Sequence, residues 1–164
     1  MSRLKRVIII FIVLIMVFSL VSCNDNKDYK RLYNDNKGIA ADGDTYSFFN
    51  RVGVTEDKTL ELKYSKFYGS ETIWIIDVEE QGDIKIDFDS SIDNGMFKAV
   101  MITPFDEVIN IFEHKKEERN KQDSSTISGK TGRYRLKIIG DNANGELKMQ
   151  IVLSDKMKIL KSSK

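Results

Sequence analysis

The sequence has very few of the residues from which catalytic and metal sites are usually built. Its 164 residues include one cysteine, Cys23, one histidine, His114, one tryptophan and one proline. A single cysteine excludes a disulfide within the chain. One cysteine and one histidine also cannot supply the several ligands of a zinc site. P-loop and dinucleotide-binding motifs are absent, and no Gly-x-Ser-x-Gly motif presents a serine nucleophile.

The charge is nearly balanced, which argues against a nucleic-acid partner. The chain has 26 basic and 25 acidic residues, and three of the basic ones lie in the first six positions. The chain after residue 22 therefore has 23 basic against 25 acidic residues, a net charge of −2. Lys, Asn, Asp and Ile are abundant, which is typical of proteins from AT-rich genomes such as those of low-GC Gram-positive bacteria.

The first residues have the pattern of an export signal. Arg3, Lys5 and Arg6 precede an apolar run over 7–21 that only Ser19 interrupts. Such a run is typical of a secretory signal peptide. It is also shorter than the roughly 20 apolar residues that span a bilayer comfortably.

The four residues Leu20, Val21, Ser22 and Cys23 resemble the lipobox of bacterial lipoproteins. The resemblance implies that residues 1–22 are removed and that Cys23 receives diacylglycerol, with acyl chains such as palmitate, as the new N-terminus. Two acyl chains give stable anchoring, whereas one holds only marginally. We therefore expect a lipid anchor at the extracytoplasmic face of the cell membrane. The alternatives are an uncleaved signal anchor and ordinary secretion with a free thiol.

Residues 23–44 are predicted to be the lipidated cysteine and a flexible tether. The stretch 24–44 is polar and charged and has no sustained apolar period. A flexible chain of about twenty residues spans roughly 25 Å. Lys27, Lys30 and Arg31 could contact anionic headgroups, but acidic residues interleave with them, so a solvated spacer is favoured.

From residue 45 to 155 apolar and polar residues alternate with the period of β-strands. Leu60, Leu62 and Tyr64 alternate with polar residues, and 84–88, 134–138 and 147–153 repeat this pattern. The stretch 72–78 is β-branched and aromatic, as in a central strand. Turns are predicted at 90–95 and 141–145. The sequence thus predicts an all-β domain, an antiparallel, jelly-roll-like β-sandwich of eight or nine short strands, followed by a basic tail over 156–164.

Two segments leave alternatives open. The stretch 104–113 fits a helix through Phe105, Val108, Ile109 and Phe112, but its β-prone residues favour a strand. The charged run 113–125 has no apolar residue and is predicted to be an exposed loop. His114 would then be a solvated surface histidine rather than a general base.

Two stretches resemble parts of small uncharacterised lipoproteins from Gram-positive bacteria. Residues 132–145 (GRYRLKIIGDNANG) resemble their closing hairpin, and residues 92–98, continuing to 104, resemble a middle hairpin. The resemblance implies a β-sandwich and membrane attachment. It brings no known activity, cofactor or catalytic residue.

Candidate binding residues are few. Tyr64, Tyr68 and Trp74 could stack against a sugar, although burial in the core is the simpler use of large rings at strand positions.

Carboxylates offer a weak metal site at most. Asp87, Asp89 and Asp93 lie within one strand and its turn, and Asp87 and Asp89 share a strand face. The EF-hand pattern is not met, so a solvated sheet face is favoured and no metal or other cofactor is expected.

The sequence therefore favours a membrane-anchored, non-enzymatic binding or accessory module of the cell envelope, with a glycan or an envelope protein as partner. The alternative is a carboxylate-dependent hydrolase of cell-wall polymers, which needs two acids across a sugar-sized cleft. A structural accessory subunit is a third possibility.

Overall fold

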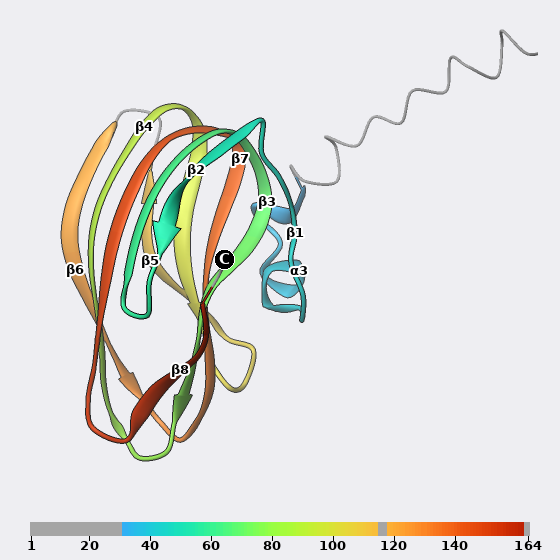
Figure 1. The fold of residues 1–164 in the computed structure, drawn as a ribbon. Helices are drawn as coiled ribbons and strands as arrows, with labels where there is room; N and C mark the ends of the chain where they lie inside the picture. Colours follow the sequence, from blue (N-terminus) through green and yellow to red (C-terminus); the bar gives the residue numbers. More distant parts are fainter. Residues whose placement is uncertain (1–30, 115–117, 163–164) are drawn as a thin grey trace, which may run out of the picture.

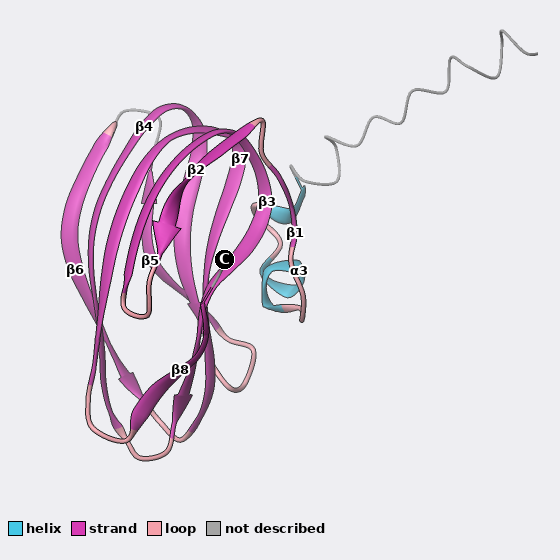
Figure 2. Cartoon of the chain, viewed as in Figure 1, coloured by secondary structure: helices cyan, strands magenta, loops and turns pink. Residues whose placement is uncertain are grey.

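Three strands of twenty or more residues, side by side in the order β3-β7-β4, carry the whole domain (Figures 1 and 2). The computed structural model describes residues 31–114 and 118–162. The long strands are β3 (Thr59–Val78), β4 (Gly82–Ile102) and β7 (Gly132–Leu153). The other elements within the described ranges are α3 (Asn36–Ala40), β1 (Thr45–Ser47), β2 (Asn50–Thr55), β5 (Val108–His114), β6 (Asn120–Gly129) and β8 (Met157–Ser162).

Each long strand bends near its middle. Lys66 and Gly69 in β3, Gly95 in β4 and Asn142 in β7 have positive φ angles. Shifts of strand register occur around the same places in β3 and β4. Glycine takes such φ angles without steric cost, and bulges bend a strand. The bends are neighbours in the sheet, because Phe67 pairs with Ala143 and Asn144 pairs with Asn94. We call this row of bends, residues 66–69, 92–96 and 141–145, the crest.

Beyond the crest the sheet folds back over itself and forms two layers. Layer one contains β2 and β6, which pair with the first halves of β3 and β4. Layer two contains β1, β8 and β5, which pair with the second halves of the same two strands. All pairings are antiparallel. This confirms the predicted antiparallel β-sandwich of eight strands, although three of the strands are long rather than short.

The main core lies between the layers. Alternate residues of each strand point inward, which gives buried series such as Leu60, Leu62 and Tyr64. Rings from opposite layers pack together across the core: Tyr64 lies 4.8 Å from Phe97, and Phe88 lies 4.3 Å from Phe112, centroid to centroid. These stacked pairs couple the two layers directly.

The predicted turns at 90–95 and 141–145 are bends inside continuous strands. The two stretches that resembled hairpins are therefore not hairpins. Asn and Gly at these positions do take positive φ, as in a turn, but the chain continues in the same strand because both of its halves find partners in β7 or β4.

The structure shows the conformation of two segments, 104–113, which the sequence left open, and 113–125, which was predicted to be a loop. The strand over 104–113 is confirmed, since Val108–His114 forms β5. The predicted exposed loop at 113–125 is wrong, because residues 120–129 form β6. As an edge strand, β6 needs few apolar residues, and Ile127 alone joins the core from it. The predicted basic tail is also wrong for 157–162, which pair with β3 as β8.

The tether prediction is wrong for residues 32–44. Tyr33, Ile39 and Ala40 are buried on the outer face of layer two against a small apolar cluster. That cluster consists of Val100, Ile102 and Ile139, with Leu32 and Val108 beside it. The folded unit thus begins before residue 45. Residues 1–30, which include the predicted signal peptide, Cys23 and the first part of the tether, lie outside the described residues.

Two cations of β7 fasten this N-terminal segment. Arg135 donates hydrogen bonds to the Ala40 carbonyl (2.6 Å) and to carboxylate oxygens of Asp42 (2.7 Å) and Asp106 (2.8 Å). Lys137, which is fully buried, donates to the Gly43 carbonyl at 2.7 Å. Burial lowers the pKa of Lys137. Because a buried ammonium needs partners, these carbonyls and the segment that carries them are held in place.

Within residues 31–114 and 118–162, no helix has both the length and the apolar character that a bilayer crossing requires.

We expect Gly95→Ala to destabilise the fold more than a matched change elsewhere. Gly95 has φ +83°, and a Cβ there would overlap the backbone of Asn142 across the crest. Gly43 has a similar φ of +90°, but a Cβ there would meet nothing within 4 Å. In denaturant unfolding, Gly43→Ala should cost about 1–2 kcal/mol for backbone strain. Gly95→Ala should cost a further 1–3 kcal/mol or so for overpacking. Equal losses in the two variants would contradict the packed crest.

Candidate functional site

A groove of about 1100 Å³ lies along one side of the crest. The bends of all three long strands contribute to it, with Tyr68 from β3, residues 92–96 from β4 and Asp141 and Asn142 from β7. Glu113 and His114 at the end of β5, with Arg119 just before β6, form the remaining wall. We call it the crest groove. It exists because the bends bring three separate segments to one place.

The lining of the crest groove is rich in hydrogen-bonding groups of both kinds. Asp93, Glu113 and Asp141 bring carboxylates, which accept, and Arg119 brings donors. The side-chain amides of Asn94 and Asn142 both donate and accept. The ring of Tyr68 and the thioether of Met96 add apolar surface. Many polar groups beside one aromatic ring can orient a small polar ligand through directed hydrogen bonds.

One groove residue, Asp141, has a buried Oδ1 atom without a hydrogen-bond partner. The Tyr33 hydroxyl interacts with Glu113 of the groove wall, and the Tyr64 hydroxyl lies in the main core near Asp93. Burial raises the pKa of both tyrosine hydroxyls, and the groove carboxylates raise it further, Glu113 at Tyr33 and Asp93 at Tyr64. Native proteins pair nearly all buried polar atoms, so the unpartnered Oδ1 atom of Asp141 calls for an explanation.

His114 does not lie on the surface as predicted; it is 2% exposed. Its Nδ1 lies 2.8 Å from the Glu118 carbonyl and must donate to it, because a carbonyl can only accept. In the neutral ring Nε2 then accepts from the Ser90 hydroxyl at 2.9 Å. This is the geometry of a nucleophile and its base. However, Ser90 is 1% exposed and lies opposite the core residue Leu147, where no substrate reaches it. The pair therefore ties layer two to layer one.

A second polar tie closes the opposite edge of the sandwich. Arg51 of β2 binds both carboxylate oxygens of Glu71 in β3, at 2.9 Å through Nη2 and 3.3 Å through Nε. Burial raises the pKa of Glu71, and the Arg51 guanidinium opposes that shift. Glu71 is thus a buried acid with a perturbed pKa, but it lies outside the crest groove and is held by Arg51.

Of the three aromatic candidates, the structure brings only Tyr68 to the groove. Tyr64 is 4% exposed and Trp74 is fully buried in the core, so no ligand can stack on either ring. The Trp74 indole instead donates to the Glu56 carbonyl at 3.5 Å.

The three acidic candidates do not form one site. Asp87 and Asp89 do share the outer face of layer one, in a shallow hollow of about 590 Å³, and Asp87 is paired with Lys85 at 2.9 Å. Asp93 lies in the crest groove instead. Within the described ranges, no group of three His, Cys, Asp or Glu side chains is arranged to hold a metal ion.

Sequence reasoning missed Glu113, Asp141 and Asn142 as groove residues and Tyr33 as a neighbour of the groove. The Asn and Gly run over 140–145 did carry a signal, because it marked a special backbone conformation. Its position beside the bends of β3 and β4 depends on long-range pairing, which that local pattern does not specify.

No protein-family model matches the chain, and no curated protein matches it. Similar solved structures include a carbohydrate-binding module from Cellvibrio mixtus lichenase 5A in complex with cellotriose, with 13% identity and a TM-score of 0.37 over 65% of this chain and 92% of that chain. A family 35 carbohydrate-binding module from an environmental isolate has 6% identity and a TM-score of 0.38, over 73% and 83% of the two chains. A C-terminal module of a laminarinase from Zobellia galactanivorans has 13% identity and a TM-score of 0.33, over 66% and 99%. Because these scores and identities are low, the fold described above stands on this chain's own strand order.

We expect the buried His114 to make stability depend on pH. Burial lowers the pKa of His114 below its usual 6.5, so the unfolded chain binds the proton more tightly than the folded one. The free energy of unfolding should therefore fall as the pH drops from about 7.5 to 5.5. Urea titrations at several pH values should show this slope in the wild type and a flatter one in His114→Gln. The raised pKa of Glu71 makes stability change with pH in the opposite direction, so Glu71 cannot produce this slope. If His114→Gln keeps the pH dependence of the wild type, His114 is not its source.

Proposed function

We propose that this protein is a non-enzymatic binding module of the cell envelope, whose crest groove binds a polyhydroxylated ligand such as a glycan. The observation that carries the proposal is a groove lined with donors, acceptors and one tyrosine ring, in which the buried Oδ1 atom of Asp141 has no hydrogen-bond partner. Each unmade hydrogen bond of a buried group costs stability, and a ligand that supplies the partner recovers it.

Sugar chemistry fits the lining of the groove. Sugar hydroxyls both donate and accept, so they can donate to Asp93 and Asp141 and accept from Arg119. The apolar C–H face of a sugar ring can stack on Tyr68. The volume of about 1100 Å³ is slightly larger than the roughly 300–1,000 Å³ typical of small-molecule pockets.

Binding without catalysis is favoured by where the reactive groups lie. The Ser90–His114 pair is closed inside the sandwich, and the acid whose pKa burial raises, Glu71, is bound to Arg51 away from the groove. A wall hydrolase would need a general acid of raised pKa inside the groove.

The proposed location comes from the sequence. The basic start, the apolar run and the lipobox-like Leu20, Val21, Ser22 and Cys23 support diacylglycerol on Cys23 and display at the extracytoplasmic face of the cell membrane. The crest groove would then meet wall glycans or other envelope components.

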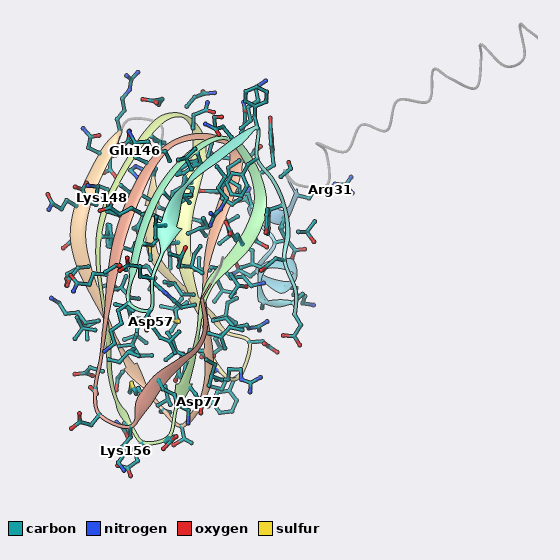
Figure 3. The ribbon with its side chains drawn as sticks, in the orientation of Figure 1. Arg31, Asp57, Asp77, Glu146, Lys148 and Lys156 are labelled. Carbon is teal, nitrogen blue, oxygen red and sulfur yellow. The ribbon has the colours of Figure 1, made fainter. Side chains whose placement is uncertain are left out.

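We expect Tyr68→Ala to weaken glycan binding. Calorimetric titration of the protein with solubilised wall polysaccharide should give an affinity lower by roughly tenfold or more, a loss typical of removing a central aromatic contact. Asp141→Asn, which keeps the shape of the side chain, should also bind more weakly. Lys148→Ala on the outer face of layer one is the matched control and should bind like the wild type (Figure 3). Equal affinities in all four proteins, or release of reducing ends during the titration, would contradict the proposal.

A further inference from the structure

We propose that an exposed aromatic corner of the domain docks on the membrane surface; this rests on the lipid anchor proposed above. The corner consists of Tyr46 and Phe49 of the β1–β2 segment, together with Lys66 of β3. Among the described residues, eight large apolar side chains are exposed, and Tyr46 and Phe49 are two of them. Phe49 is 79% exposed, more than any other of the eight.

The fold does not need these side chains, yet it holds the corner firmly. Phe48 turns inward and stacks on Phe67 with ring centroids 4.3 Å apart. The next residue, Phe49, donates its backbone N–H to the Ser65 carbonyl at 2.9 Å, while its ring points to solvent. The Lys66 ammonium lies 5.2 Å from the centroid of that ring. A fixed ring that contributes nothing to the core is suited to an external contact.

The combination of groups fits a bilayer interface. Tyrosine is enriched at the level of the lipid headgroups, phenylalanine enters the boundary between headgroups and acyl chains, and lysine is attracted to anionic lipids. An aromatic ring and a lysine occur together at Phe49 and Lys66. The patch is also small: two apolar side chains and one lysine fall well short of the roughly 800 Å² per partner that a stable protein interface buries. A contact that is weak alone suffices if something else already holds the domain at the bilayer.

The length of the anchor supplies that condition. Seven residues lie between Cys23 and Arg31, where the described chain begins, and these eight residue steps reach at most about 28 Å. The chain cannot gain slack beyond this point, because Tyr33 and Ile39 are buried and Arg135 holds the Ala40 carbonyl. A short tether gives a weak contact a high effective concentration.

The first described residue, Arg31, and the corner lie toward the same end of the molecule. In the common view of Figures 1 and 3, the chain enters at Arg31 on the upper right of the molecule. The connection between β1 and β2 lies at the upper right as well. The outer face of layer one near Glu146 and Lys148 lies on the opposite side of this view (Figure 3).

The test uses the full-length lipidated protein in vesicles of phosphatidylglycerol and phosphatidylethanolamine, some of which carry bromine near the headgroup. Phe49→Trp places a fluorophore at the corner. Phe105→Trp is the matched control, because Phe105 is 76% exposed on the turn between β4 and β5. The natural Trp74 is buried in the core and gives a constant background. Phe49→Trp should lose emission in brominated vesicles and shift to shorter wavelength, whereas Phe105→Trp should do neither.

The outcomes separate the docking from the anchor. If wild-type protein floats with the vesicles but Phe49→Trp is quenched no more than Phe105→Trp, docking is overturned and the anchored module remains. A shift that depends on protein concentration without bromine quenching would mean that a second copy covers the corner, which also overturns docking. If the wild type carries no diacylglycerol by intact mass and floats no better than Cys23→Ala, the anchor itself fails and docking with it.

Discussion

The structure depends on three neighbouring strands bending at the same height. On both sides of the crest, β7 pairs with β3 and β4. If any one of the three strands ended at its bend, the two layers would no longer be built on the same three strands. Positive φ angles at Gly69, Gly95 and Asn142 make the bends sterically possible. The same bends expose backbone and polar side chains that a flat sheet would pair, so the crest is also where a site can form.

The two layers are joined by an apolar core and by one polar tie at each edge. Ring pairs such as Tyr64 with Phe97 fill the space between the layers, while Arg51–Glu71 and His114–Ser90 close the sides. Both ties satisfy their buried polar atoms. The unpartnered Oδ1 atom of Asp141 belongs to the crest groove instead, apart from the groups that hold the two layers together.

Period-two alternation located the inward faces of the strands, because burial on one side of a sheet imposes it on the sequence. It could not tell a bend from a turn, since Asn and Gly permit positive φ in both. The candidate tyrosines show the consequence. A register shift between Tyr64 and Phe67 reverses the parity of β3, so Tyr64 faces the core whereas Tyr68 reaches the groove. Tyr33 and Ile39 lack any period, and only the outer cluster of layer two explains their burial.

The most direct test of the crest groove as the binding site is a map of amide chemical shifts during titration with solubilised wall polysaccharide. The account predicts changes at 92–96, at Glu113 and Arg119, and at Asp141 and Asn142, which line the groove. Residues 85–89 and 146–150, on the outer face of layer one, should stay unchanged. Shifts confined to that outer face would place the ligand elsewhere and contradict the account.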